Sequence, residues 1–291
     1  MSMKFAALNF LLLLLHLLLR YADGRGDEQL ENVLRLHSMD HDRRIEDDGG
    51  VEARVDSLSH MDHMDQSVMV FFTLKDLKAG NSMPIYFRKK DPSTSPRFLP
   101  RDEADAIAFS LAELPTLLRF FSFSQGSPQA KAMEATLREC EIPAIKGEVK
   151  FCATSIESML DFTSSILGSN SDFKILATEH HTKSSIVFQN YTILKAPDEI
   201  PAPRMVACHT MPYPYAVLYC HSQETQNRVF KVSLGGENGD RVTAVAVCHM
   251  DTSQWKRDHV SFRVLGMEPG TPGICHFFPA DNFVLVPDSN L

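Results

Sequence analysis

The fold is decided by the stretch Arg241-Val242-Thr243-Ala244-Val245-Ala246-Val247-Cys248-His249, which predicts a core β-strand that ends in a Cys-His dipeptide. Adjacent residues on a strand point to opposite faces of its sheet. The sulfur can therefore enter a core or a disulfide while the imidazole faces a separate site. Four such dipeptides occur, with gaps of 10, 26 and 25 residues: Cys208-His209, Cys220-His221, Cys248-His249 and Cys275-His276. On strands, they can provide four anchors and one cluster of four imidazoles.

The expected secondary structure changes along the chain near residue 184. Before it, acidic, proline and capping signals predict helices over residues 102–110, 115–121 and 130–137, a further helix that ends at Gly168, and strands at 71–74 and 84–87. After it, short β-type runs are separated by Gly- and Pro-containing turns. The predicted strands are 185–188, 191–194, 205–210, 216–221, 229–234, 241–248, 260–265 and 283–286. The sequence thus predicts an α+β fold, with a helical first half packed on a mostly antiparallel β second half that carries the four Cys-His pairs.

The first 70 residues predict export followed by a spacer. Residues 1–24 have the charge, apolar run and small residues of a signal peptide, and the run is shorter than the ~20 residues that span a bilayer; a retained signal anchor is the alternative. Residues 25–70 hold five basic and twelve acidic residues, nearly all of the formal net charge of −8, and predict a disordered spacer. We expect a secretory-pathway protein with no membrane contact after signal removal, and no nucleic-acid partner, because no basic patch exists.

Cysteines in an oxidising compartment are expected to pair. The six are Cys140, Cys152, Cys208, Cys220, Cys248 and Cys275. Six cysteines allow 15 connectivities, and the sequence does not choose among them; a Cys140–Cys152 loop is one plausible choice. Sulfurs in disulfides cannot act as thiolate ligands, so histidine would have to hold any metal.

The histidines have two possible roles, and the more specific one is to form a metal centre. Nitrogen-only ligation suits Cu(II) or Zn(II), and copper is favoured by raw affinity. The expected ligands are His209, His221, His249 and His276, with His180, His181 and His259 as weaker candidates and Asp251 as an orienting partner. Two segments rich in His, Met and Asp, residues 37–41 and 60–65, could also hold a metal weakly. The alternative is that the cysteines staple strands while the histidines form hydrogen bonds inside the fold.

The sequence segments around the Cys-His dipeptides resemble those of a known family. They are Phe71-Phe72, Cys248-His249-Met250-Asp251-Thr252-Ser253-Gln254-Trp255, Cys275-His276-Phe277-Phe278-Pro279 and Val286-Pro287. With the dipeptide spacings, they resemble the plant BURP domain over residues 71–287, roughly three quarters of the chain. The short spacer without repeats is similar to the unknown-seed-protein-like and microspore-embryogenesis groups. The resemblance implies that the paired histidines are a copper site, because some members are copper-dependent peptide cyclases that cross-link Trp or Tyr side chains. Other members look non-catalytic, including seed and drought-linked proteins and a cell-wall partner of polygalacturonase.

Two functions follow, and whether the chain is an enzyme stays open. The first is a copper-dependent oxidoreductase that cross-links, or macrocyclises, peptide side chains; it would act in trans, since residues 25–70 contain no Trp or Tyr. The second is a non-catalytic protein of the cell wall or storage vacuole in seed or reproductive development; regulation of a pectin-degrading enzyme is a smaller possibility. The partner would be a peptide or a component of the wall or vacuole. Tyr213, Tyr215 and Tyr219 either line a groove or pack on strands, Trp255 is expected to pack in a core or loop, and Asn190 begins a glycosylation sequon.

Overall fold

The computed structural model describes residues 69–88, 95–168, 172–271 and 273–288. The predicted signal peptide, nearly all of the spacer and both segments rich in His, Met and Asp lie outside these residues. The described part combines helices with two β-sheets, and each strand pair recorded in it is antiparallel.

The larger sheet has eight strands in the order β1-β12-β11-β10-β6-β2, with β5 paired to β11 and β7 to β10. Its strands are β1 (Phe71–Thr73), β2 (Ser82–Tyr86), β5 (Glu179–His180), β6 (Phe188–Ile193), β7 (Asp198–Ile200), β10 (Asn227–Gly236), β11 (Arg241–His249) and β12 (Ile274–Phe277). The smaller sheet has five strands in the order β3-β9-β8-β13-β4. These are β3 (Glu148–Ala153), β4 (Phe173–Ala177), β8 (Val206–Met211), β9 (Val217–Gln223) and β13 (Phe283–Pro287).

The two sheets pack face to face. Val245 and Val247 of β11 share a buried cluster with Ala207 of β8 and with Val284 and Val286 of β13. The intervening residues of the same strands lie in other cores. Ala246 and Cys248 belong to the outer core of the larger sheet, and Val206 and Cys208 belong to the outer core of the smaller one. The alternation expected of strands therefore separates an inner face from two outer faces.

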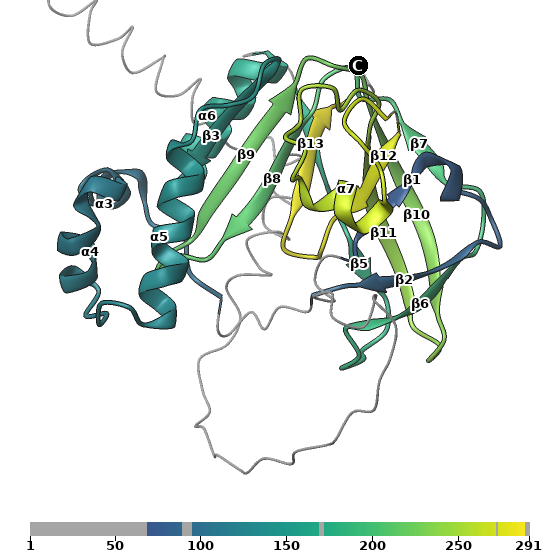
Figure 1. Ribbon diagram of the computed structural model, residues 1–291, viewed down its shortest axis with the longest axis horizontal. Coiled ribbons are helices and arrows are strands. Elements are labelled where there is room, and N and C mark those ends of the chain that lie inside the picture. The colour runs from purple at the N-terminus through teal and green to yellow at the C-terminus, as the bar shows by residue number, and fades with distance from the viewer. Residues whose placement is uncertain (1–68, 89–94, 169–171, 272, 289–291) are drawn as a thin grey trace, which may run out of the picture.

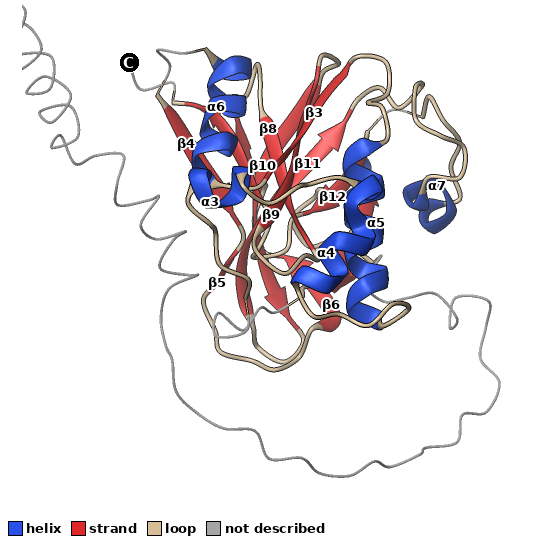
Figure 2. Ribbon diagram, turned by 90° about the vertical axis from the view of Figure 1, so that its left-hand side faces the viewer, coloured by secondary structure: helices blue, strands red, loops and turns tan. Residues whose placement is uncertain are grey.

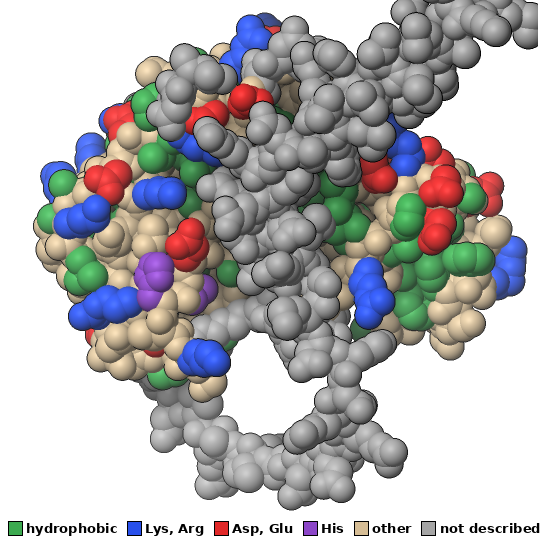
Figure 3. Space-filling model, turned by 180° about the vertical axis from the view of Figure 1, so that it is seen from behind, with side chains coloured by type: hydrophobic (Ala, Val, Ile, Leu, Met, Phe, Trp, Pro, Cys, Tyr) green, Lys and Arg blue, Asp and Glu red, His purple; other side chains and the backbone are tan. Residues whose placement is uncertain are grey.

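Most helices cover the smaller sheet. They are α3 (Arg101–Asp105), α4 (Leu114–Phe120), α5 (Pro128–Glu141) and α6 (Ile156–Leu167), with the short turns η2 (Leu74–Asp76) and η4 (Leu111–Glu113). The side chain of Ser127 caps α5, and Ser155 and Ser158 form a capping box on α6. Figure 1 shows α3 to α6 gathered beside β3 and β9, and Figure 2 shows the same helices in front of the strands. Figure 3 shows hydrophobic side chains on the lobe formed by α3 and α4, where Phe120 is 65% exposed.

The mixed composition and the antiparallel pairing agree with the sequence prediction, but several details of it were wrong. Residues 260–265 were predicted as a strand and form helix α7 (Val260–Leu265). His259 caps this helix by accepting a hydrogen bond from the backbone N–H of Ser261, and Gly266, with a φ of 62°, ends it. The predicted strands at 71–74 and 84–87 are confirmed as β1 and β2, which join the larger sheet, whereas β3, at the edge of the smaller sheet, was missed. The predicted strands 185–188 and 191–194 are one strand, β6, and β4, β5, β7 and β12 were missed.

Candidate functional site

Two disulfides each join two neighbouring strands of one sheet. Cys208 of β8 lies directly opposite Cys220 of β9, with their Cα atoms 4.1 Å apart. Cys248 of β11 lies opposite Cys275 of β12, with their Cα atoms 3.9 Å apart. All four are fully buried in the outer cores. Each disulfide therefore fixes the register of a strand pair, because a slip of one residue would separate the two sulfurs.

The third disulfide joins Cys140 at the end of α5 to Cys152 of β3. This settles the connectivity as Cys140–Cys152, Cys208–Cys220 and Cys248–Cys275, and no described cysteine is free.

The histidines that follow the four cross-strand cysteines face the space between the sheets. His209 and His221 are diagonal neighbours on the inner face of the smaller sheet, since His209 is opposite Tyr219 and His221 is opposite Ala207. His249 and His276 occupy the equivalent diagonal on the larger sheet. The two diagonals face each other across the interior.

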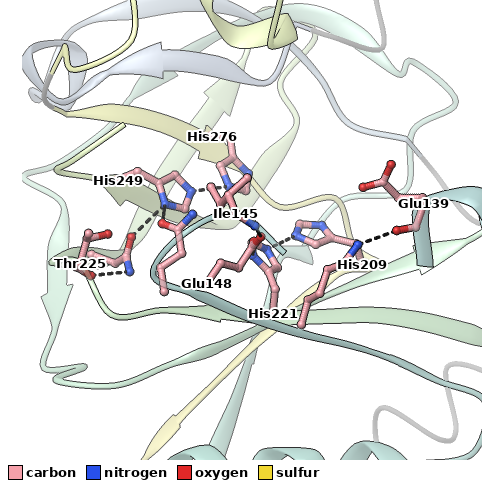
Figure 4. A network of polar contacts seen from close by, with 11 residues as sticks. Glu139, Ile145, Glu148, His209, His221, Thr225, His249 and His276 are labelled. Carbon is pink, nitrogen blue, oxygen red and sulfur yellow. Dashed lines mark hydrogen bonds and ion pairs between the residues drawn. The ribbon is translucent and has the colours of Figure 1, made fainter. Parts of the chain in front are cut away.

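The four rings form a row of two close pairs, as Figure 4 shows. The Nε2 atoms of His209 and His221 are 3.3 Å apart, and so are those of His249 and His276. Between the pairs, the ring centroids of His209 and His276 are 6.0 Å apart. Phe278 supports this junction, because its buried ring stacks on His209 at 5.0 Å and on His276 at 4.9 Å. One aromatic side chain thus links the pairs of both sheets.

In the His249–His276 pair, the partners of His249 fix the position of its hydrogen. Nδ1 of His249 lies 2.8 Å from Oδ1 of Asn227 and 3.0 Å from Oε1 of Gln223, both acceptors, so it carries the hydrogen. Asn227 is held in this orientation because its Nδ2 donates to the carbonyl of Thr225. A neutral imidazole has one N–H, so Nε2 of His249 presents a lone pair to His276.

Burial favours the neutral form of both rings at neutral pH. Burial lowers the pKa of His276 to about 3, and the neighbouring charges of His209 and His221 act in the same direction. Burial, followed by the charge of His276, holds the pKa of His249 well below its usual range. Two nitrogens held about 2.0–2.1 Å from one ion at a tetrahedral angle are about 3.3–3.4 Å apart. The observed separation therefore fits a cation shared by His249 and His276, with further positions open to other ligands.

The same burial predicts acid sensitivity of the metal-free protein. Burial also lowers the pKa of His209 to about 3, whereas an unfolded histidine titrates near about 6.5. The unfolded state thus binds more protons as the pH falls below about 6.5, and stability should drop by about 1.4 kcal/mol per pH unit for each such histidine. Urea unfolding of the metal-free chain between neutral pH and pH ~4 measures this slope. The variant His276→Gln should reduce the slope, and an unchanged midpoint in the wild type across that range would contradict the burial argument.

All four rings line one cavity of about 730 Å³. Its walls also contain aromatic side chains and charged ones; among them are Phe71, Tyr86, Tyr219, Trp255, Glu148 and Lys150. Trp255 lies with its ring centroid 4.9 Å from that of His249 and 4.4 Å from that of His259. The cavity thus brings an indole ring directly beside the metal-compatible pair.

The weaker metal candidates separate into near and distant residues. His259 lines the cavity, and its Nδ1 lies 2.7 Å from Oγ of Ser261. His180 packs edge-on against Phe87 in the outer core, and His181 is exposed with Nε2 2.8 Å from Oγ1 of Thr243. Neither lines the cavity. Across the described residues, no set of three or more His, Cys, Asp or Glu side chains is arranged to hold one ion.

The residues that orient the imidazoles were not anticipated. Asp251 is exposed and accepts from the backbone N–H of Ser253 instead of contacting a histidine. The actual partners of Nδ1 are Glu148 for His221, Asn282 for His209, and Gln223 and Asn227 for His249. Only Asn227 had a usable signal, since a β-hairpin between residues 221 and 248 would place it across from His249. Glu148 and Asn282 are each 73 residues from the histidine that they contact.

Other predicted residues have clear positions. Tyr213 and Tyr215 are buried in the helical core with Met133 and Leu137 and do not line the cavity, whereas Tyr219 does. Trp255 is a loop residue in the cavity wall and not a core residue. Asn190 is exposed on β6, where its Nδ2 donates to Glu237 over 2.9 Å; its glycosylation stays a prediction.

Comparisons with known sequences identify the family of the chain. The profile of the BURP domain matches residues 70–287. BURP domain-containing protein BNM2A of Brassica napus is 46% identical over 227 residues, covering 76% of this chain and 80% of that protein. BURP domain protein USPL1 of Arabidopsis thaliana is 47% identical over 227 residues, covering 76% of this chain and 81% of that protein. BURP domain protein RD22 of the same plant is 40% identical over 224 residues, covering 76% and 56%. The chain belongs to the BURP-domain family.

Three disulfides are compatible with a secreted protein. Within the described residues, no helix is both long and apolar enough to cross a bilayer.

Proposed function

We propose that this BURP-domain protein binds copper between His249 and His276 and cross-links aromatic side chains of another polypeptide. The observation that carries the proposal is the pair of Nε2 atoms that face each other at 3.3 Å in the wall of the cavity, with the lone pair of His249 directed at the second ring. Two neutral rings at this distance either share a hydrogen bond or, when both carry their hydrogen on Nδ1, hold a cation between their Nε2 atoms. Copper is the first choice because imidazole ligands and the affinity order favour it.

The cavity walls suit an aromatic guest. Trp255 and Tyr219 present rings to the same space as the imidazoles, and aromatic pairs are stabilised by edge-to-face or offset contact. Bound copper would supply one-electron oxidation, the chemistry needed to remove hydrogen from a phenol or an indole. The protein residues would hold the guest and exclude water. The surroundings of the reaction would be the secretory pathway, ending in the cell wall or a storage vacuole.

The direct test is incubation of the purified, signal-free protein with copper, dioxygen and a library of Trp- and Tyr-containing peptides. Products lighter by about two mass units per cross-link are expected, because two hydrogen atoms pass to dioxygen. The variant His276→Ala should give none. Absence of such products from a copper-loaded, folded protein would count against the enzymatic function.

A non-catalytic role in the wall or vacuole, in seed or reproductive development, is the second candidate. It is favoured by the absence of any set of three or more metal-ligating side chains among the described residues. In that case His249→Ala should leave the plant phenotype intact, while Cys248→Ala should abolish it by destabilising the fold. Complementation of a mutant plant with each variant separates the two functions.

A further inference from the structure

We propose that Asn282 withholds the His209–His221 pair from the metal by fixing His209 in the tautomer whose hydrogen is on Nε2. The two histidine pairs then differ in function although their distances are the same. The metal-binding part of this inference rests on the proposed function, whereas the tautomer of His209 does not.

The orientation of the Asn282 amide follows from its neighbours. The backbone N–H of Thr210, which can only donate, lies 3.0 Å from Oδ1 of Asn282. The hydroxyl of Thr210 donates to Oδ2 of Asp281 over 2.9 Å and lies 3.3 Å from the same Oδ1. A rotated amide would place its NH2 group against the Thr210 N–H, donor against donor. Nδ2 of Asn282 therefore faces Nδ1 of His209, 3.0 Å away, and donates to it.

This contact determines the hydrogen positions of the whole pair. Nδ1 of His209 is an acceptor, so the neutral ring carries its hydrogen on Nε2. On the other side, Nδ1 of His221 lies 2.8 Å from a carboxylate oxygen of Glu148 and donates to it, which leaves Nε2 of His221 as an acceptor. The 3.3 Å contact between the two Nε2 atoms is then a hydrogen bond from His209 to His221. The series from Asn282 to Glu148 has each donor matched to an acceptor.

The His249–His276 pair differs from the His209–His221 pair in the groups that contact the Nδ1 atoms. Nδ1 of His249 faces oxygen acceptors, so its Nε2 carries a lone pair. Among the described residues, no side chain donates a hydrogen bond to Nδ1 of His276, so this ring can carry its hydrogen on Nδ1 while both Nε2 atoms bind a cation. At His209, a metal on Nε2 would have to displace a hydrogen that Asn282 keeps in place. The nitrogen that is metallated in a histidine is set by the bond that the other nitrogen makes.

Asn282→Asp tests this, because a carboxylate has the same shape, keeps an acceptor for Thr210 and replaces the NH2 donor by an acceptor. Copper bound per folded chain should rise about two-fold, from about one ion to about two. In the metal-free protein, nitrogen NMR of the His209 ring should show the hydrogen on Nε2 in the wild type and on Nδ1 in the variant. The matched control is Asn190→Asp, the same change at an exposed amide outside the cavity, which should leave the copper content unchanged. Adding His209→Ala to Asn282→Asp should remove the extra ion.

Each outcome is decisive for one of the two claims. Hydrogen on Nδ1 of His209 in the metal-free wild type overturns the role of Asn282, as does a folded Asn282→Asp variant that still binds a single copper ion. Two copper ions in the wild type overturn it as well. A wild type that binds no copper, with the expected His209 tautomer, instead overturns the proposed function and leaves the assignment of Asn282 standing.

Discussion

Removal of the Cys248–Cys275 disulfide by the paired changes Cys248→Ser and Cys275→Ser should lower the free energy of unfolding by about 3–4 kcal/mol. The disulfide closes a segment with a sequence separation of 27 residues, so its loss gives the unfolded chain more conformational freedom. The two hydroxyls would also lie in a core with no exposed surface. Because the same link holds β11 and β12 in register, we expect His249 and His276 to lose their alignment and copper binding to fail. Urea unfolding and metal analysis of the purified variant measure the two effects.

The matched control is the double variant Cys140→Ser and Cys152→Ser. That disulfide closes a separation of 12 residues and is partly exposed, so the expected loss is smaller, about 2–3 kcal/mol. It also lies outside the strands that carry the imidazoles, and copper binding should persist. If the control lost copper binding while the Cys248–Cys275 variant kept it, the assignment of register control to the cross-strand disulfide would be wrong.

Copper(II) should quench most of the fluorescence of the chain, because its only tryptophan, Trp255, lies against His249. The ring centroids are 4.9 Å apart, so an ion shared by His249 and His276 would be close to the indole. Zinc, which has no redox chemistry, should occupy the same nitrogens without comparable loss of emission. Titration of the purified protein with each ion, followed by a chelator, measures binding and reversibility.

The variants for this titration are chosen so that the tryptophan keeps its surroundings. His276→Ala removes a ligand that is not among the ring contacts of Trp255, and the quenching should disappear. His221→Ala alters the other pair and should leave the quenching nearly intact. Equal quenching in the wild type and His276→Ala would show that copper does not bind between His249 and His276.

The periodicity of the strands allowed much of the site to be anticipated from sequence. In the run from residue 241 to 249, alternate residues enter the outer and inner cores, which places Cys248 and His249 on opposite faces. The same alternation applies to β8, so the meeting of the imidazoles depends only on local geometry and on the pairing of the two sheets. Helix α7 was missed because Val260, Val264 and Leu265 suit a strand as well as a helix, and the cap at His259 decided between them.

The hydrogen-bond partners of the imidazole Nδ1 atoms could not be predicted from the strand periodicity. Asn282, just before β13, and Glu148 of β3 are each 73 residues from the histidine that they contact. Their side chains become neighbours of the imidazoles only when the order β3-β9-β8-β13 of the smaller sheet is formed. A spacing of Cys-His dipeptides specifies neither that order nor whether a partner donates or accepts. The difference between the two pairs is therefore a property of the tertiary structure.

Formation of the two cross-strand disulfides would have to precede copper binding at the proposed site, because these disulfides align the strands that carry the imidazoles. A chain that remains in the reducing cytosol would keep free thiols in place of the links that align the imidazoles. Ribosome-bound or mistargeted copies would then have no aligned nitrogens with which to capture copper, and nearby cellular proteins would be spared unwanted oxidation. If the chain is exported as its sequence predicts, the disulfides would form in the endoplasmic reticulum, and export would activate the proposed site.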